Sequence, residues 1–384
     1  MQETFFKESV ALGVANTELR ADLKDGDTLH KPYGSYARVQ TYTKGTDIVV
    51  KDISSTDDIL TVATAKVASF YVDDIDRIQN KYATIKEFAA GAQRQLNNTL
   101  DQAVFAEYTN AGKTLSGPDI GAAVGGIVFT PSNTADVFTA AGRVLNSKKR
   151  LGGERFALIG PRMLETIQNY VGGRETGFGD TVGDNGKVAT RFGFGLRLSN
   201  NLPFSASLEM SVIPTAGDTI TINGVVLTAA ANGAATNAGE FSIGVSAAAA
   251  RVNLAGLIND SLTPGATTYI ALSAEDRQLL EEAGSIATDN IAGTQIDYTG
   301  YGDIVVSETL TNAGSVWSAQ LQYALMGQVG AIDLVTQVAP NVVFRDAQLR
   351  LGKYVHPWML YGKKTFTRMR DSLVAVQFDV SAWV

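Results

Sequence analysis

The amino-acid sequence predicts an α+β fold made of several structural units. Three observations support this prediction: a β-like segment with apolar residues at even spacings, a very long amphipathic helix directly after it, and an embedded stretch of roughly a hundred residues with both strand and helix signals. At 384 residues the chain is long for one compact domain. We therefore expect two or three units around sizeable cores.

The first 72 residues predict an arm followed by a hairpin. Residues 1–36 have weak periodicity and several turn-forming residues, so we expect an extended N-terminal arm. Residues 37–72 are β-like, with a polar run at 54–58 between two halves, and they predict an extended hairpin that reaches away from any core. Its apolar residues include Ile48, Val50, Leu60, Val62 and Phe70.

The strongest local pattern predicts a helix over 74–108. Apolar residues recur there at steps of three and four, Asp73 or Asp74 can cap its start, and an Asn-Ala-Gly stretch at 110–112 offers a left-handed stop. At 1.5 Å per residue, about 35 residues span on the order of 50 Å. A helix of that length needs a partner coil or a flat molecule that it can brace, and the lack of sustained charged flanks disfavours the coiled coil.

The elements after this helix predict two further units. A second helix beginning at Ser132 or Asn133, a short apolar strand at 156–159 and a helix after it complete a unit at 73–170. A glycine-rich loop follows. We expect residues 171–207 to join residues 313–384, which contain strand-like runs, in a discontinuous unit with closing strands.

Residues 208–312 predict an inserted α+β domain, because their composition shifts toward Ala, Gly and Thr. An Asn-Gly pair at 223–224 predicts a hairpin turn. Ser246 can cap one helix, and Ser273 with Asp276 resembles a capping box before a second helix that Gly284 can end.

Few residues could support catalysis or bind a metal. The chain has two histidines, His30 and His356, and for His356, which precedes a proline in an apolar stretch, a structural role is favoured over a general base. There is no Gly-x-Ser-x-Gly elbow and no phosphate-binding glycine loop. Asp73, Asp74 and Asp76 could hold a cation, but a helix-capping role is favoured. The sequence thus predicts no enzyme, with no catalytic, cofactor or metal site.

Composition and charge narrow the remaining classes. Charged residues make up 18% of the chain, which is low for a globular protein and fits a subunit whose surface neighbours cover. The net charge of −7 argues against coating nucleic acid or an anionic membrane. Residues 345–370 are basic and residues 1–30 acidic; solvated strand edges are favoured over charge complementarity between subunits. The N-terminus lacks the layout of a secretory signal, which predicts the cytosol or a particle assembled there.

Specific stretches resemble the coat subunits of tailed bacteriophages with the Hong Kong 97-type fold. The order of arm, protruding hairpin and very long helix is similar to theirs. The run Phe-Tyr-Val-Asp-Asp-Ile-Asp-Arg at 70–77 with Asp-Gln-Ala at 101–103 looks like their hairpin exit and backbone helix. Residues 192–203 resemble a strand and turn of their axial domain, and residues 341–345 and 361–364 look like their closing strands. The resemblance covers roughly residues 1–205 and 313–384.

This resemblance implies a role for each segment. Residues 1–36 would be the N-terminal arm and 37–72 the extended hairpin loop. The peripheral domain would be 73–170 with the spine helix 74–108, and the axial domain 171–207 with 313–384. Residues 208–312 depart from the family as an inserted domain, for which we expect an outward position near the capsomer axis. Contacts between subunits are expected at Ile48, Val50, Leu60, Val62 and Phe70.

The implied function is that of a major capsid protein, which self-assembles into the icosahedral head shell around phage DNA. Its expected partners are copies of itself in pentamers and hexamers, a portal, optionally a decoration protein, and DNA only non-specifically, with no membrane. Arm-like sequence at Met1 adds the expectation of a separate scaffolding protein. The expected location is the virion, assembled in the host cytoplasm. Two alternatives are an encapsulin-like compartment, which holds enzyme cargo, and a surface-layer protein, which needs a secretion signal.

Overall fold

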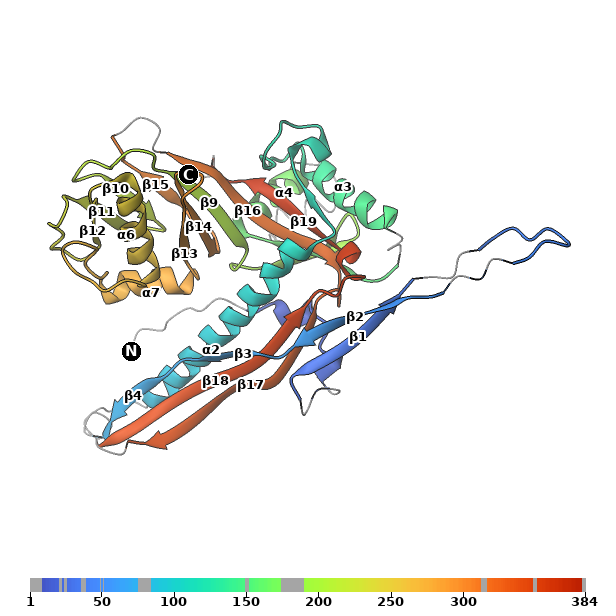
Figure 1. Ribbon diagram of the computed structural model, residues 1–384, viewed down its shortest axis with the longest axis horizontal. Coiled ribbons are helices and arrows are strands. Elements are labelled where there is room, and N and C mark those ends of the chain that lie inside the picture. Colours follow the sequence, from blue (N-terminus) through green and yellow to red (C-terminus); the bar gives the residue numbers. More distant parts are fainter. Residues whose placement is uncertain are drawn as a thin grey trace. The chain divides into compact units, whose positions relative to one another are not determined.

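In the computed structural model the chain divides into two compact units, which are described separately (Figure 1). The larger unit comprises Met1–Gly13, Asn97–Val329 and Asp371–Val384, and the smaller comprises Val14–Leu96 and Gly330–Arg370. The structure describes residues 9–20, 23, 26–35, 39–48, 50, 52–74, 84–148, 152–173, 190–311, 316–347 and 351–381.

A large mixed sheet forms the core of the larger unit. Nine strands of the described chain belong to it, in the order β13-β14-β9-β16-β6-β8-β7, with β19 paired to β16 and β5 paired to β19. The central strand β16 is buried at Ala324, Leu325 and Met326, because it has neighbours on both sides. The strands are β5 (Lys113–Leu115), β6 (Arg155–Ile159), β7 (Thr190–Arg191), β8 (Phe194–Leu198), β9 (Pro203–Glu209), β13 (Ile286–Asn290), β14 (Gln295–Tyr301), β16 (Trp317–Gln328) and β19 (Leu373–Asp379).

Two amphipathic helices pack beside this sheet. Helix α3 (Thr134–Ser147) contacts β19 and helix α4 (Pro161–Gly172). Its buried residues recur at helical spacing and include Val137, Ala141 and Leu145. The second helix and the strand before α4 are therefore confirmed in type, with boundaries within two residues of the prediction.

A smaller sheet, which we call the satellite sheet, holds β12 (Glu240–Ser242), β11 (Val225–Ala230), β10 (Thr219–Ile222) and β15 (Val306–Glu308), in that order. Helix α6 (Ala247–Asn259) contacts both β12 of the satellite sheet and β13 of the large sheet (Figure 1). Because it packs on two sides, α6 is buried nearly all round rather than along one stripe.

The predicted inserted domain 208–312 needs a correction. Strands β13 and β14 lie inside that range, yet they extend the large sheet through β9, and Tyr298 of β14 is fully buried there. Backbone pairing with β9 therefore ties residues 286–301 to the main core. What stands apart is the satellite sheet with α6 and α7 (Ala274–Glu282).

Turn and cap signals within this range are confirmed. Asn223 and Gly224 have φ of 51° and 86°, the left-handed pair that a two-residue hairpin turn requires. The Ser246 hydroxyl accepts from the amide of Ala249 at 3.2 Å, and that of Ser273 accepts from the amide of Asp276 at 3.1 Å. Because these caps are formed by residues three positions apart, the sequence alone was enough to predict where α6 and α7 begin.

The smaller unit contains a four-stranded sheet and a two-stranded ribbon. In the sheet, β18 (Gly352–Lys364) pairs with β17 (Asp333–Asp346) on one side and with β3 (Thr64–Val67) and β4 (Phe70–Asp73) on the other. The ribbon pairs β1 (Thr28–Gly34) with β2 (Ser55–Thr61). Long β18 thus ties together segments from both ends of the sequence (Figure 1).

Helix α2 (Thr84–Phe105) confirms the described part of the long predicted helix. A short 3₁₀ turn, Ala106–Asn110, continues it. The predicted beginning of the helix, residues 75–83, lies outside the described residues. Residues up to Leu96 belong to the smaller unit, where the ring of Phe88 packs edge-on against Phe70, and the rest belong to the larger unit.

The predicted arm 1–36 is not extended throughout, which is a second correction. Val14 is fully buried, and Asn16 pairs with Asp333 at the start of β17 in a bridge of backbone hydrogen bonds. Residues 28–34 form β1, the first strand of the hairpin that was predicted to begin at residue 37. Pro32 and Gly34 are among the turn-forming residues of this range, but pairing with β2 holds them extended, so tertiary contacts override the local preference.

Candidate assembly surfaces

The loop between β1 and β2, residues 35–54, carries a group of exposed apolar side chains. Its described residues, 35, 39–48, 50 and 52–54, form no strand. Val50 is 86% exposed and Ile48 64%. The other large exposed apolar residues of this loop are Val39, Tyr42 and Ile53. Several such side chains on one short loop mark an interaction surface, because water contact with them is unfavourable.

Two of the predicted contact residues lie elsewhere. Leu60 is fully buried and Val62 is 5% exposed, in a small core with Leu23, Val335 and Phe366. The alternation of β2 turns Leu60 inward, so the base of the ribbon has an interior of its own. The assignment of Leu60 and Val62 to contacts between subunits is therefore wrong for this structure. The expectation that the hairpin reaches away from any core is also wrong at its base.

Phe70, the fifth predicted contact residue, is neither fully buried nor fully exposed. It is half-buried on β4, and its ring centre lies 6.2 Å from that of Phe88 on α2. Its ring therefore packs within the smaller unit. Ile48 and Val50 are the predicted contact residues whose side chains lie in water.

An ion pair between a buried carboxylate and a partly exposed lysine holds the base of the ribbon. The Lys364 ammonium contacts the carboxylate of Asp58, which is 8% exposed, and donates to the carbonyl of Ile59 at 2.7 Å. The Thr367 amide donates to Asp58 at 2.8 Å. Burial by itself would raise the pKa of Asp58, but these hydrogen bonds and the lysine charge outweigh it and hold the pKa below its usual 3.8.

The basic segment 345–370 therefore has two kinds of partner. Lys364 and Arg368 bind the ribbon, where the Arg368 guanidinium donates to the carbonyl of Gly34. Lys353 lies in water, 3.5 Å from an exposed carboxylate of Asp346. Lys353 has a partly exposed side chain on a strand that is paired on both sides, whereas Lys364 and Arg368 pair with the front end of their own chain. The favoured interpretation of solvated strand edges therefore does not describe these residues.

The two histidines lie apart on separate strands. His30 contacts Asp57 on the exposed ribbon. His356 on β18 is 2.8 Å from the Ser69 hydroxyl and stacks on Tyr354. Among the described residues, no three acidic or histidine side chains gather where they could hold a metal ion; Asp76 lies outside them. No helix in that part of the chain has the length and hydropathy to cross a membrane.

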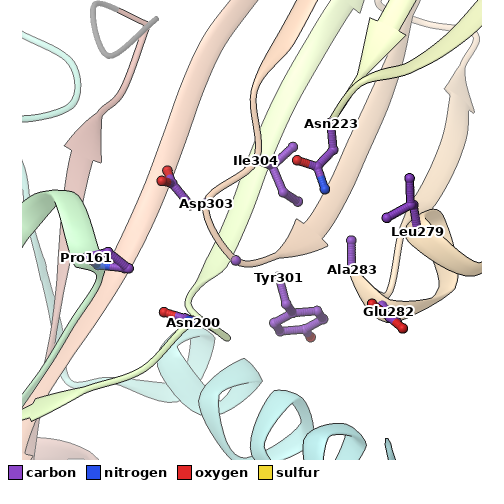
Figure 2. A pocket seen from close by; sticks show the side chains of 10 residues that line it. Pro161, Asn200, Asn223, Leu279, Glu282, Ala283, Tyr301, Asp303 and Ile304 are labelled. Atoms are coloured by element: carbon purple, nitrogen blue, oxygen red, sulfur yellow. The ribbon is translucent and has the colours of Figure 1, made fainter. Parts of the chain in front are cut away.

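A pocket of about 260 Å³ opens in the larger unit between the satellite sheet and the start of α4 (Figure 2). Its two carboxylates are already engaged, since Asp303 accepts from Arg162 at 2.9 Å and Glu282 accepts from Gln278 at 2.8 Å. Both carboxylates are therefore occupied by contacts within the protein. Its lining residues are Pro161, Asn200, Asn223, Leu279, Glu282, Ala283, Tyr301, Gly302, Asp303 and Ile304.

Comparison with known proteins gives structural matches over nearly the whole chain. No protein-family model and no curated protein matches the sequence. A structure from Mycobacterium phage Che8 matches with a TM-score of 0.57 and 13% identity, over 98% of this chain and 93% of that one. The capsid of the cyanophage P-SCSP1u matches at 0.52 and 12%, over 99% and 90%. The mature capsid of bacteriophage PhiM1 matches at 0.50 and 12%, over 98% and 89%.

The chain has the fold of a phage capsid subunit. The α+β capsid fold expected from the resemblance is thereby confirmed. At 12–13% identity, the likeness lies in how the elements are arranged rather than in particular side chains. The side chains that stabilise this copy of the capsid fold have to be found in its own contacts.

One such contact in this capsid fold is Asp101 on α2, which is fully buried in the larger unit. Its carboxylate accepts from the Ser9 hydroxyl at 2.7 Å and from the amides of Val10 and Ala11 at 2.9 and 3.1 Å. Burial raises the pKa of Asp101 above 3.8 despite these donors. The sequence reasoning missed this anchor, although an acidic residue directly after Leu100 in the apolar stripe was a usable signal.

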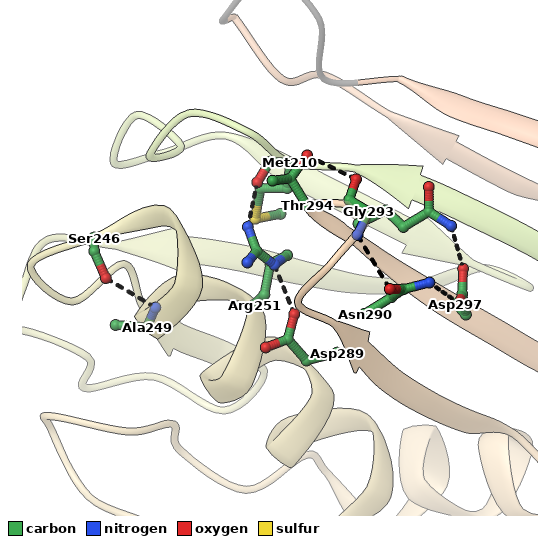
Figure 3. A network of polar contacts seen from close by, with 10 residues as sticks. Met210, Ser246, Ala249, Arg251, Asp289, Asn290, Gly293, Thr294 and Asp297 are labelled. Atoms are coloured by element: carbon green, nitrogen blue, oxygen red, sulfur yellow. Dashed lines mark hydrogen bonds and ion pairs between the residues drawn. The ribbon is translucent and has the colours of Figure 1, made fainter.

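Two further contacts tie the satellite region to the rest of the capsid fold. Arg251 of α6, 3% exposed, donates to the Asp289 carboxylate at 2.7 Å and to the Met210 carbonyl at 2.8 Å (Figure 3). At the end of α7, the Glu282 carbonyl accepts from Gln102 of α2 at 3.0 Å. These side chains were not singled out from sequence, because their partners lie 38 and 180 residues away.

Proposed function

We propose that this chain is the major capsid protein of a tailed phage, which self-assembles into the icosahedral head shell around phage DNA. The observation that supports this most strongly is the end-to-end likeness to phage capsids, which covers 98–99% of this chain and about nine-tenths of each of those chains.

The proposed mechanism is mechanical. Loop 35–54 of one copy covers a different surface of a neighbouring copy, with Ile48 and Val50 as the contact residues. A contact between two different surfaces propagates from copy to copy and closes into rings where the rotation allows. Burying one such side chain fully is worth about 1.5–3 kcal/mol, so a few of them per subunit stabilise a shell of many copies.

The proposal implies a set of partners and a location. Copies of this chain form pentamers and hexamers, in the virion, after assembly in the host cytoplasm. A separate scaffolding protein, a portal and optionally a decoration protein would complete the head. Contact with packaged DNA is non-specific, in line with a net charge of −7. The chain would have no enzymatic activity.

The segments would have the roles that the resemblance implies. Residues 28–61 would supply the extended hairpin and α2 the spine. The predicted peripheral range 73–170 is divided between the two units, and so is the predicted axial range 313–384. We therefore assign the peripheral role to the smaller unit and the axial role to the large sheet. The satellite sheet with α6 and α7 would lie outward near the capsomer axis. Deleting residues 210–285, which removes all of this region except β15, tests whether it contributes to assembly, because a purely decorative region would leave shell yield unchanged.

Expression of the chain alone and with a phage scaffolding protein tests the proposed function. Sedimentation separates assembled from free protein, and negative-stain electron microscopy shows the form of the assemblies. Closed, uniform shells are expected. Flat lattices would favour a surface-layer protein and shells that enclose a host enzyme would favour a compartment. Small oligomers alone under both conditions would contradict every shell-forming function.

A further inference from the structure

The direction of the β1–β2 ribbon depends on what holds its base. A two-stranded ribbon is at best marginally stable by itself in water. The inward side chains at this end of β2 are Asp58 and Leu60, one charged and one apolar. Leu60 is held by the small core of the smaller unit. Apolar contacts of this kind fix the position of the base, but they are non-directional and do not set the angle of the ribbon. Directional contacts come from the Arg368 guanidinium, which donates to the Gly34 carbonyl of β1, and from Asp58 of β2.

Gly362 of β18 allows the base of the ribbon to lie directly on that strand. A Cβ atom at Gly362 would lie 2.5 Å from the carbonyl oxygen of Thr61 and 2.9 Å from the Cα of Val62. Both neighbours are backbone atoms, so a larger residue could be accommodated only by moving the end of β2.

Lys364, two residues further along β18, binds polar groups of β2 at the base of the ribbon. Its ammonium group contacts both the Asp58 carboxylate and the Ile59 carbonyl, and it lies 5.8 Å from the centre of the Phe366 ring. The Thr367 amide holds the second carboxylate oxygen of Asp58. Hydrogen bonds are directional, so this set fixes the angle of the ribbon as well as its place.

We propose that Gly362 and Lys364 are positioning residues that set the direction of the β1–β2 ribbon and thereby present loop 35–54 to a second copy of this chain at a fixed angle. This inference rests on the proposed function. A preset angle matters because the entropy cost of ordering a flexible segment is subtracted from the binding free energy of an interface. A loop that is already held at the right angle avoids part of this cost. The direction is therefore built into each subunit before assembly.

A distance measurement in the subunit tests the positioning role without assembly. The chain has no cysteine, so Thr56→Cys on β2 and Asn341→Cys on β17, both exposed, place one pair of spin labels within the smaller unit. Labelled protein is diluted with unlabelled protein to remove contributions between copies. One narrow distance distribution is expected, which Lys364→Met and Gly362→Ala each broaden or shift.

Lys353→Met is the matched control, because Lys353 lies on the same strand and its partner Asp346 is exposed. The control is expected to keep the parental distribution. A parental distribution in both Lys364→Met and Gly362→Ala would overturn the proposal. Lys364→Met leaves the Asp58 charge buried without its lysine, so Asp58→Asn with Lys364→Met provides a folded alternative. In this double variant, circular dichroism should match the parent while the distance still broadens, and a narrow parental distance would again overturn the proposal.

Assembly of the same variants separates this inference from the function on which it rests. Lys364→Met is expected to give about tenfold fewer closed shells than Lys353→Met at equal concentration, because each mispositioned loop weakens a contact that is repeated in every subunit. Equal yields would overturn the positioning role and leave the capsid function standing. If neither the parent nor the control forms shells, the proposed function fails and this inference fails with it.

Discussion

At the scale of single residues, stability in this capsid fold depends on buried carboxylates that bind segments far apart in the sequence. Asp101 holds three donors of residues 9–11 within the larger unit, and Asp58 holds Lys364 and Thr367 within the smaller. In both cases a charge taken out of water is compensated by several hydrogen bonds, without which it would be strongly unfavourable.

Replacing Asp101 by Ala should lower the free energy of unfolding by about 1–3 kcal/mol, because three donors lose a buried acceptor. Relief of the buried charge offsets part of the loss. Urea unfolding of the free subunit measures the change, with Glu165→Ala, an exposed position on α4 of the same unit, as the control within about 0.5 kcal/mol. A loss at Asp101 no larger than that of the control would show that the anchor contributes nothing.

Asp58 should make stability depend on acid pH. Its pKa in the folded chain is below the ordinary 3.8, so the folded state binds the proton less readily than the unfolded state. Its contribution is therefore fully present above about pH 3.8 and is lost as the pH falls through the lower, folded-state value. The difference in unfolding free energy between the parent and Asp58→Asn should shrink over that acid range. A difference that stays constant from pH 7 to pH 3 would contradict the ion pair.

At the scale of elements, loop 35–54 and the base of the ribbon should respond in opposite ways to substitution. Ile48→Ser with Val50→Ser should leave subunit stability within about 0.5 kcal/mol, since both side chains are already in water, but should abolish shell formation. Leu60→Ala should instead cost about 2–5 kcal/mol of stability, because it leaves a cavity in the small core.

Urea unfolding and sedimentation of the same preparations distinguish the two effects. If the loop variant assembled normally, its exposed apolar residues would not be contact residues. If Leu60→Ala left stability unchanged and lost assembly alone, the original assignment of Leu60 to a contact between subunits would be restored.

Local signals predicted elements well where the interactions are local. The cap at Ser246, the turn at Asn223 and Gly224, and the described part of α2 all depend on residues a few positions apart. Strand partners were harder, because β1 pairs with β2 across the whole of loop 35–54. An even spacing of apolar residues shows which face is buried but not against what.

At the scale of the whole molecule, the order of elements was enough to predict the capsid fold. It was not enough to predict the domain boundaries. The inserted range 208–312 looked independent by composition, yet β13 and β14 complete the large sheet. The composition of a segment reflects how exposed its residues are. The boundary of a domain in a sheet depends instead on which strands pair through their backbone groups. The exposed loop surface was predicted at Ile48 and Val50, and the buried pair of Leu60 and Val62 was assigned to it wrongly because the same spacing suits an internal core.

A single-particle cryo-electron microscopy reconstruction of the assembled particle would show whether this subunit is completed by contact with another copy. We expect an icosahedral shell in which Ile48 and Val50 of each subunit lie buried against a neighbouring copy. A particle in which loop 35–54 packs only on its own subunit, with both side chains still in water between copies, would contradict it.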